Sequence, residues 1–284
     1  MKKDHKSKIT RYYNDSQILY RFFWMNKRNL AMHYGLWDKD TKSKHEALIN
    51  ENEYIGRDLD IKDSDIVLDA GCGVGGTSIW IAEKYGAKVV GINIVEKQIK
   101  LANKYAKERK ADNLVSFELG DYCKTNFPNE SFDKIFALES VCHTDDKDAF
   151  VKEAYRLLKP GGKFCIYDYF INKLNNETDK QNYETFCNGW AMSNLAKQTE
   201  FEKFLSKNGF KNIRFSDLTS KALESSKRIR NASNAWLWVD KTLNFFKIVS
   251  DENVISTKAS VVQYDFFKDG AGYYGSFYAE KTEG

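Results

Sequence analysis

The chain has 284 residues, of which 42% are hydrophobic and 30% are charged, and its formal net charge is +4. This length can bury a full core, and the composition is that of a globular protein. So small a charge does not indicate a nucleic-acid partner. The sequence shows no apolar run that could span a bilayer and no secretory signal pattern. The five cysteines show no C-x-x-C pairing, so we expect reduced thiols, a cytoplasmic location and no metal site.

Residues 1–60 are predicted to form a helical cover rich in aromatic side chains. The residues concerned are Tyr12, Tyr13, Tyr20, Phe22, Phe23, Trp24, Met25 and Met32. A stripe of this kind belongs more often to a core than to a ligand site. His33 follows in a turn that is expected to border a pocket, and we assign it no chemistry.

Residues 67–76 contain the most informative pattern, an apolar strand that ends at Asp69 and runs into a glycine turn at Gly71, Gly73 and Gly75. Glycines permit such a turn and allow a ligand to approach the backbone. The dinucleotide pattern G-x-G-x-x-G is also satisfied, but alone it is weak. A nicotinamide site favours an acidic residue about 20 positions later, where this chain has Asn93. The pattern predicts an adenosine-type cofactor at the carboxyl end of the first strand.

The elements that follow alternate as in an α/β protein. Strands are expected over 88–94, 113–122 and in the second half of 126–139, then a helix over 146–158 that stops at 159–162. A fifth strand over 163–169, a helix over 198–207, a sixth strand over 210–218 and a final strand over 273–281 complete the sheet.

Residues 219–262 are too long for a hairpin loop and carry helical patterns, so they are predicted to be a helical insertion. This insertion either caps the active site or forms an interface between copies of the chain. Its basic residues Lys227, Arg228 and Arg230 are expected on a solvated face, with an anionic substrate or peripheral contact with a membrane as alternatives. The chain then divides into a cover (1–60), a cofactor-binding core (61–218), a cap (219–262) and a final strand (263–284).

The ordered motifs D-A-G-C-G-x-G-G, G-D, S-F-D and L-K-P-G-G, spread over about residues 65–170, resemble class I S-adenosylmethionine-dependent methyltransferases. The N-terminal Y-Y-N and the later H-Y-G-L-W-D turn are similar to the sterol, tocopherol and sugar O-methyltransferase group, whose wider kin include cyclopropane synthases. The resemblance implies a Rossmann-like α/β sheet, mostly parallel with its last strand antiparallel, together with N-terminal helices and a helical cap. It also implies S-adenosylmethionine as the cofactor.

The resemblance also implies roles for individual residues. Asp69 is expected near the amino group of the cofactor, Gly71, Gly73 and Gly75 under its methionine part, and Asn93 and Ile94 beside its ribose, with Gln98 as a further contact. Asp121 is expected to accept a hydrogen bond from the adenine amino group, with Tyr122 beside the ring, and Leu138 where the fourth strand opens toward the sulfur. Tyr12 or Tyr13 would approach the sulfonium, where a cation–aromatic contact contributes about 0.5–2 kcal/mol.

Methyl transfer requires the acceptor to be aligned with the methyl group and one proton to be managed. His143 is the candidate base for a hydroxyl or amine acceptor, because histidine titrates near neutral pH. Glu139 is expected to orient His143 or to stabilise a developing positive charge. The alternative is that His143 only packs or caps a helix, since some methyltransferases use no base.

Three functional hypotheses remain open. The first is methylation of a small, apolar acceptor of the prenyl, sterol or polyketide type, favoured by the aromatic covering segments. The second is methylation of a small amine on the same fold. The third is a non-enzymatic protein that binds the cofactor or acts as a regulator.

Overall fold

The computed structural model describes residues 6–13 and 29–283, and within these ranges it contains one sheet of seven strands in the order β3-β2-β1-β4-β5-β7-β6. The strands are β1 (Ile66–Ala70), β2 (Lys88–Asn93), β3 (Val115–Leu119), β4 (Phe132–Leu138), β5 (Leu158–Ile171), β6 (Lys211–Asp217) and β7 (Gly272–Glu280). The first five are mutually parallel, and β7 runs antiparallel between β5 and β6.

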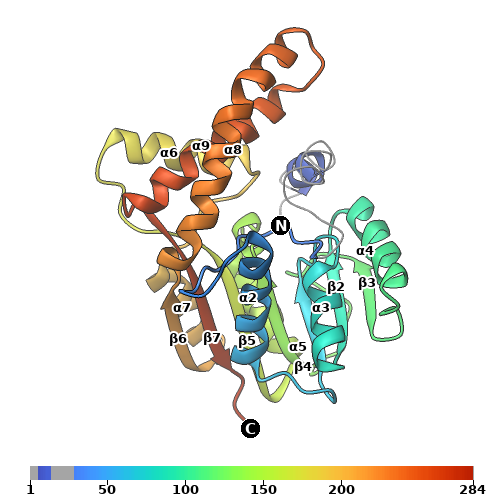
Figure 1. Cartoon of the computed structure of the whole chain (residues 1–284). Helices are drawn as coiled ribbons and strands as arrows, with labels where there is room; N and C mark the ends of the chain where they lie inside the picture. Colours follow the sequence, from blue (N-terminus) through green and yellow to red (C-terminus); the bar gives the residue numbers. More distant parts are fainter. Residues whose placement is uncertain (1–5, 14–28, 284) are drawn as a thin grey trace.

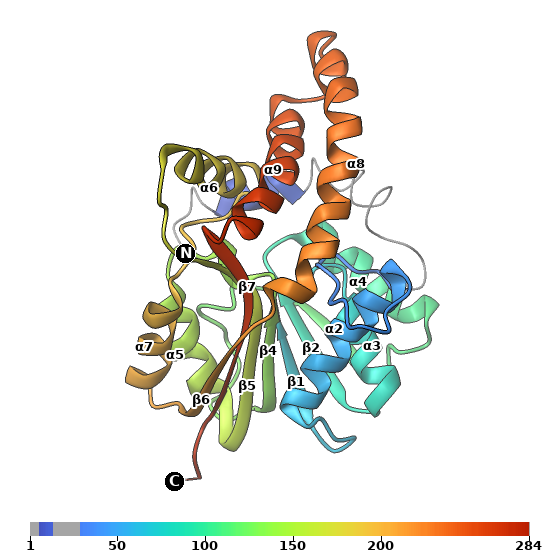
Figure 2. The same ribbon diagram turned by 60° about the vertical axis from the view of Figure 1, so that its left-hand side comes forward.

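Helices cover both faces of this sheet, so its strands are buried between two layers (Figures 1 and 2). On one face lie α2 (Lys44–Leu59), α3 (Gly76–Tyr85) and α4 (Glu96–Glu108). On the other lie α5 (Lys147–Leu157) and α7 (Gln198–Lys207). A single 3-10 turn, η1 (Val141–His143), follows β4, and a further helical segment spans residues 6–13.

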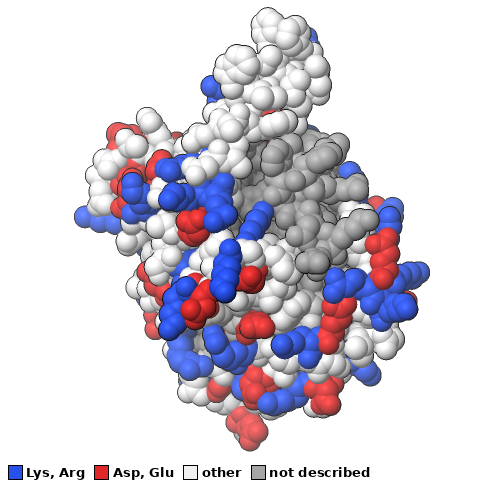
Figure 3. All heavy atoms as spheres, in the orientation of Figure 1, with Lys and Arg blue, Asp and Glu red and all other residues white. Residues whose placement is uncertain are grey.

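Three helices stand at the carboxyl end of the parallel strands and form the cap: α6 (Glu177–Gly189), α8 (Thr219–Phe245) and α9 (Asp251–Lys268). α8 and α9 form a hairpin that projects away from the sheet (Figure 1). The far end of this hairpin is mostly free of charged atoms on the face shown in Figure 3. Its exposed apolar side chains are Trp238, Phe245, Phe246 and Ile248.

The predicted fold class is confirmed, with local differences from the sequence expectations. Within the described residues, the N-terminal cover is helical only over 6–13 and in α2, and residues 29–43 are a loop. The expected helix stop at 159–162 is instead the start of β5, because Leu158 already pairs with Phe132 and a register shift follows. α9 continues past residue 262, and α6 was not anticipated. Part of the predicted aromatic cover lies outside the described residues, namely Tyr20, Phe22, Phe23, Trp24 and Met25.

The first crossover, from β1 into α3, depends on glycines with two different functions. Gly75 has a φ of +82°, and a Cβ added there would lie 2.5 Å from the Phe117 ring. Gly73 has a φ of +52°, but the nearest atom to an added Cβ would be the Met32 sulfur at 3.7 Å. Gly75 therefore permits close packing, whereas Gly73 borders open space at the end of β1.

Replacing Gly75 with alanine is expected to destabilise the protein more than replacing Gly270. Both glycines have a left-handed φ, which costs a non-glycine residue about 1–2 kcal/mol, but nothing lies within 4 Å of an added Cβ at Gly270. Overpacking against Phe117 adds about 1–3 kcal/mol for Gly75→Ala. Urea unfolding of the two variants measures this difference, and equal losses would contradict the packing role of Gly75.

Candidate active site

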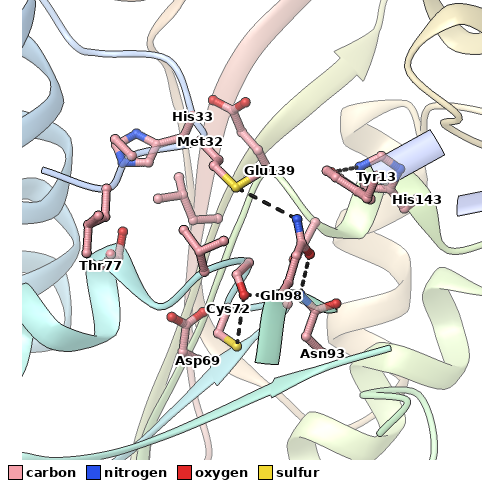
Figure 4. A pocket seen from close by; sticks show the side chains of 18 of the residues that line it. Tyr13, Met32, His33, Asp69, Cys72, Thr77, Asn93, Gln98, Glu139 and His143 are labelled. Carbon is pink, nitrogen blue, oxygen red and sulfur yellow. Dashed lines mark hydrogen bonds between the residues drawn. The ribbon is translucent and has the colours of Figure 1, made fainter. Parts of the chain in front are cut away.

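A cavity of about 80 Å³ lies where the carboxyl ends of β1, β2 and β4 meet the N-terminal residues of the chain (Figure 4). Ligand cavities are usually concave and formed where parallel strands end. The cavity is lined by these residues predicted from the sequence: Tyr13, Asp69, Gly71, Gly73, Asn93, Ile94, Gln98, Tyr122, Leu138, Glu139 and His143. Of the predicted set, Gly75 and Asp121 do not line it.

Asp69 lies at the inner end of this cavity and is almost completely buried. Its carboxylate accepts a hydrogen bond of 2.5 Å from the Ser78 hydroxyl at the start of α3. Burial raises the pKa of Asp69 to about 7, although the Ser78 bond and the charge of His33 act against the rise. A positively charged group placed beside Asp69 would favour its ionised form.

Asn93, at the end of β2, uses its side chain to hold the glycine turn. Its amide donates to Gln98 Oε1 at 2.7 Å and to the Gly73 carbonyl at 3.4 Å, and its oxygen accepts from the Val95 backbone at 3.3 Å. Gln98 Nε2 in turn lies 3.8 Å from the sulfur of Met32 (Figure 4). The chain of contacts links the floor of the cavity to the N-terminal loop that covers it.

Asp121, predicted to bind adenine, forms an ion pair with Lys6 from the N-terminal helical segment, with 2.5 Å between Lys6 Nζ and Asp121 Oδ2. Burial acts to raise the pKa of Asp121, but the hydrogen bonds from Lys6 and from the Cys123 backbone outweigh it, so this pKa is lowered. The neighbouring Tyr122 is buried and donates to the Ser140 carbonyl at 2.7 Å. An adenine amino group at Asp121 would compete with Lys6.

Glu139 ends β4 in a left-handed conformation with a φ of +46°, which is strained for a residue other than glycine. Its side chain accepts hydrogen bonds from the Tyr34 backbone at 2.6 Å and from the Tyr169 hydroxyl, and the Tyr274 hydroxyl oxygen lies 3.0 Å from it. Burial raises the pKa of Glu139 to about 8, and the nearby charge of Glu51 adds to the rise. Burial thus favours the protonated form of Glu139, whereas the hydrogen bonds from Tyr34 and Tyr169 favour the ionised form.

A second carboxylate, Glu51 of α2, lies beside Glu139 and shares a partner with it. Glu51 accepts from the Tyr274 hydroxyl at 2.5 Å and from His33 Nδ1 at 2.6 Å. Burial alone lowers the pKa of His33, but the bond to Glu51 and the charges of Glu51 and Glu139 outweigh it, so this pKa is raised. This contact favours the charged form of His33, whose Nδ1 lies 2.6 Å from Glu51 beside Glu139.

His143, the predicted base, lies in η1 with both ring nitrogens engaged. Nδ1 lies 3.1 Å from the Ala191 carbonyl, which can only accept, so Nδ1 carries the proton and Nε2 accepts from the Tyr13 hydroxyl at 2.9 Å. The turn that positions His143 is held by Asp168, which accepts from the Cys142 backbone at 3.0 Å. His143 can therefore take a proton only through, or in place of, the Tyr13 hydroxyl.

A second cavity, of about 280 Å³, lies between the 33–48 region and the hairpin of α8 and α9. Its walls include the apolar side chains Leu48, Trp190, Ile229, Ala232 and Trp236. A small cavity of about 20 Å³ separates the two larger ones; it shares Tyr12 and Trp190 with the second and Tyr13, Met32, Glu139 and His143 with the first. His33 lines both the first and the second cavity, and Glu139 lines the first and the small one.

Sequence reasoning missed Glu51, Tyr169 and Tyr274, and it named His33 without assigning it a role. Glu51 lies three residues after Leu48 and four before Ile55, on the buried face of α2, and this helical spacing was the available signal for it. The alternating aromatic residues at the ends of two strands were the only available signal for Tyr169 and Tyr274. In the described parts of the chain, no group of His, Cys, Asp or Glu side chains is placed to hold a metal ion.

Comparison with known proteins identifies a methyltransferase domain in the chain. The model of a methyltransferase domain matches residues 68–166, which include the glycine turn and the end of β4. The resemblance to class I S-adenosylmethionine-dependent methyltransferases is confirmed. A sterol 24-C-methyltransferase of Kluyveromyces lactis is 32% identical over 178 residues, which cover 63% of this chain and 47% of that protein. The chain thus spans about half the length of this relative.

Two solved structures share the fold across nearly the whole chain. The mycolic acid cyclopropane synthase CmaA1 superimposes with a TM-score of 0.84 and 19% identity, covering 98% of both chains. The geranyl diphosphate C-methyltransferase of Streptomyces coelicolor gives a TM-score of 0.73 and 19% identity, also covering 98% of both chains. At these identities the structures establish the methyltransferase fold and nothing further.

The raised pKa of Glu139 predicts that stability falls as the pH rises. Folded Glu139 keeps its proton up to about pH 8, whereas an unfolded glutamate loses it near pH 4.3, so the folded state binds the extra proton in between. For each proton that only the folded state binds, the free energy of unfolding falls by about 1.4 kcal/mol per unit rise in pH. Urea titrations between pH 5 and 7.5 should therefore show that the free energy of unfolding declines less steeply with pH in Glu139→Gln than in the wild type. The control Glu153→Gln should decline as steeply as the wild type. Equal slopes for Glu139→Gln and wild type would contradict the assignment.

Proposed function

We propose that this protein is an S-adenosylmethionine-dependent methyltransferase that acts on a small, apolar acceptor. The observation that supports this most is the presence of two neighbouring cavities that share His33, one beneath the glycine turn and one with apolar walls. The first suits the cofactor and the second the acceptor. A site for a single ligand would not need this division.

The residues of the first cavity fit the cofactor. Asp69 would hold its amino group, Gly73 leaves room beside the backbone, and Asn93 would lie toward the ribose. Asp121 lies outside the cavity lining and would meet the adenine only in place of Lys6. A cavity of 80 Å³ is smaller than the roughly 300 Å³ or more of most ligand sites, so Met32 and the helical segment 6–13 would have to move outward. When bound, S-adenosylmethionine supplies a methyl group activated by a positively charged sulfur.

The side chains around Glu139 would align the acceptor and control the local charge. A positive charge arriving beside Glu139 lowers the pKa of this residue, so the carboxyl group can ionise when a cation needs to be stabilised. Aromatic rings of Tyr34, Tyr169, Tyr274 and Trp190 pack together around it, and ring faces also attract cations. His143, with Tyr13, would accept a proton from an acceptor that has one to lose.

The relatives support an apolar acceptor as a class and do not identify one molecule. The matched relative is named as a sterol methyltransferase, and one structure as a geranyl diphosphate methyltransferase. Methylation of a small amine is the second candidate, because paired carboxylates beside aromatic rings also suit an ammonium group. The apolar walls and the size of the second cavity favour the larger acceptor.

Three predictions about the surroundings of the protein stay predictions: a cytoplasmic location, peripheral contact with a membrane, and self-association through the cap. The exposed apolar side chains at the end of the α8–α9 hairpin support the latter two equally. Among the described residues, no helix is both long and apolar enough to cross a bilayer.

The direct test is incubation with methyl-deuterated S-adenosylmethionine and a panel of prenyl alcohols and phosphates, sterols, quinols and amines, with product mass as the readout. We expect a gain of one labelled methyl group on an apolar acceptor, and stabilisation of the folded protein by the cofactor alone. His143→Ala should lower turnover about 10²–10⁴-fold if a base is needed, with cofactor affinity nearly unchanged.

The outcomes separate the hypotheses. Transfer only to amines would replace the proposal with the second candidate. Cofactor binding without transfer to any member of the panel would favour a non-enzymatic role. The absence of stabilisation at millimolar cofactor would overturn the proposal altogether. Lys227→Ala, on an exposed part of α8 outside all three cavities, serves as the control variant.

A further inference from the structure

The larger cavity has an uneven distribution of charge. Sixteen described residues line it, and among them are Lys44 of α2 and Arg228 of α8 but no aspartate or glutamate. An apolar acceptor on its own gives no reason for two cationic side chains at its binding site. Burial and the nearby charge of Arg228 lower the pKa of Lys44, which shows that the two cations affect each other.

The two cations lie at the outer end of the cavity. Arg228 is exposed and Lys44 is half-buried, whereas Tyr34, Leu48, Trp190 and Ser225 deeper in the cavity are buried. The inner end adjoins His33 and, through the small cavity, Glu139. A ligand that fills the cavity would therefore have one end at the carboxylate pair and the other at the cations.

Arg228 is held in position by groups outside the cavity lining. Its guanidinium lies over the Trp37 ring, 4.6 Å from the ring centre, and its Nε donates to Glu224 Oε1 at 2.8 Å. Arginine has five N–H donors in a fixed plane, so a bond through Nε still leaves donors that can bind an anion. The hydroxyl groups of Ser233 and Ser256 add further donors to the wall, whereas the Ser225 hydroxyl already donates to the Gly35 carbonyl at 2.7 Å.

We infer that the acceptor is an amphiphile whose anionic group, a phosphate or a carboxylate, is bound by Lys44 and Arg228, while its apolar body extends inward to the methyl-transfer site. This inference rests on the proposed function and specifies its substrate class. The reacting atom then lies at the end of the molecule opposite the anion. Neutral sterols and amines without an acidic group would be poor acceptors.

Three probes with one apolar body test the inference: geranyl phosphate, geranic acid and geraniol. Their dissociation constants can be measured in the presence of S-adenosylhomocysteine by quenching of tryptophan fluorescence, because Trp190 and Trp236 line the cavity. We expect at least one anionic probe to bind about tenfold or more tightly than geraniol, since charge-assisted hydrogen bonds are the stronger ones. Whichever anionic probe binds more tightly shows whether the anionic group of the acceptor is a phosphate or a carboxylate.

The double variant Lys44→Met/Arg228→Met should lose this preference while its affinity for geraniol stays within about twofold. The control Lys42→Met/Lys227→Met removes the same charge from neighbouring, exposed positions outside the cavity, and it should keep the preference. Equal binding of all three probes to the wild type, or equal losses in both double variants, would overturn the inference. The probes can also be ranked without S-adenosylhomocysteine, so failure of the cofactor to bind would count against the proposed function alone.

Discussion

The structure depends on two carboxylates, Glu51 and Glu139, that are buried together and share one tyrosine hydroxyl. The Tyr274 hydroxyl has a single proton, and it lies within hydrogen-bond distance of both. Two buried negative charges so close together would be very costly. The contact between Glu51 and His33, and the raised pKa of Glu139, both reduce this cost.

This arrangement connects parts of the chain that are distant in sequence. Glu51 belongs to α2, Glu139 to the end of β4, Tyr274 to β7 and His33 to the N-terminal loop. The same loop is fixed to the cap, because the Tyr34 hydroxyl donates to Gln263 of α9. The carboxylate pair therefore joins the core, the cover and the cap at the point where the two larger cavities approach each other. A change in the charge of the carboxylate pair would therefore affect contacts in the core, the cover and the cap.

The core and Glu139 could be predicted from the sequence, whereas Glu51, the other member of the carboxylate pair, was missed. The glycine turn, Asp69 and the strand ends carry local patterns, because backbone geometry at a parallel sheet restricts which residues fit there. The helical spacing places Glu51 on the buried face of α2, but its partner Tyr274 is 223 positions away in the sequence, so its role depends on the tertiary fold. His33 illustrates the same limit, since only its contact with Glu51 distinguishes it from an ordinary turn residue.

A crystal structure of the protein with S-adenosylhomocysteine tests the central claim most directly, namely that the cofactor ends at the carboxylate pair. The account predicts density beneath the glycine turn, with the amino group at Asp69, the adenine at Asp121 in place of Lys6, and the sulfur facing Glu139. Density in the larger cavity instead, or an adenine placed away from Asp121 with the Lys6 pair intact, would contradict it.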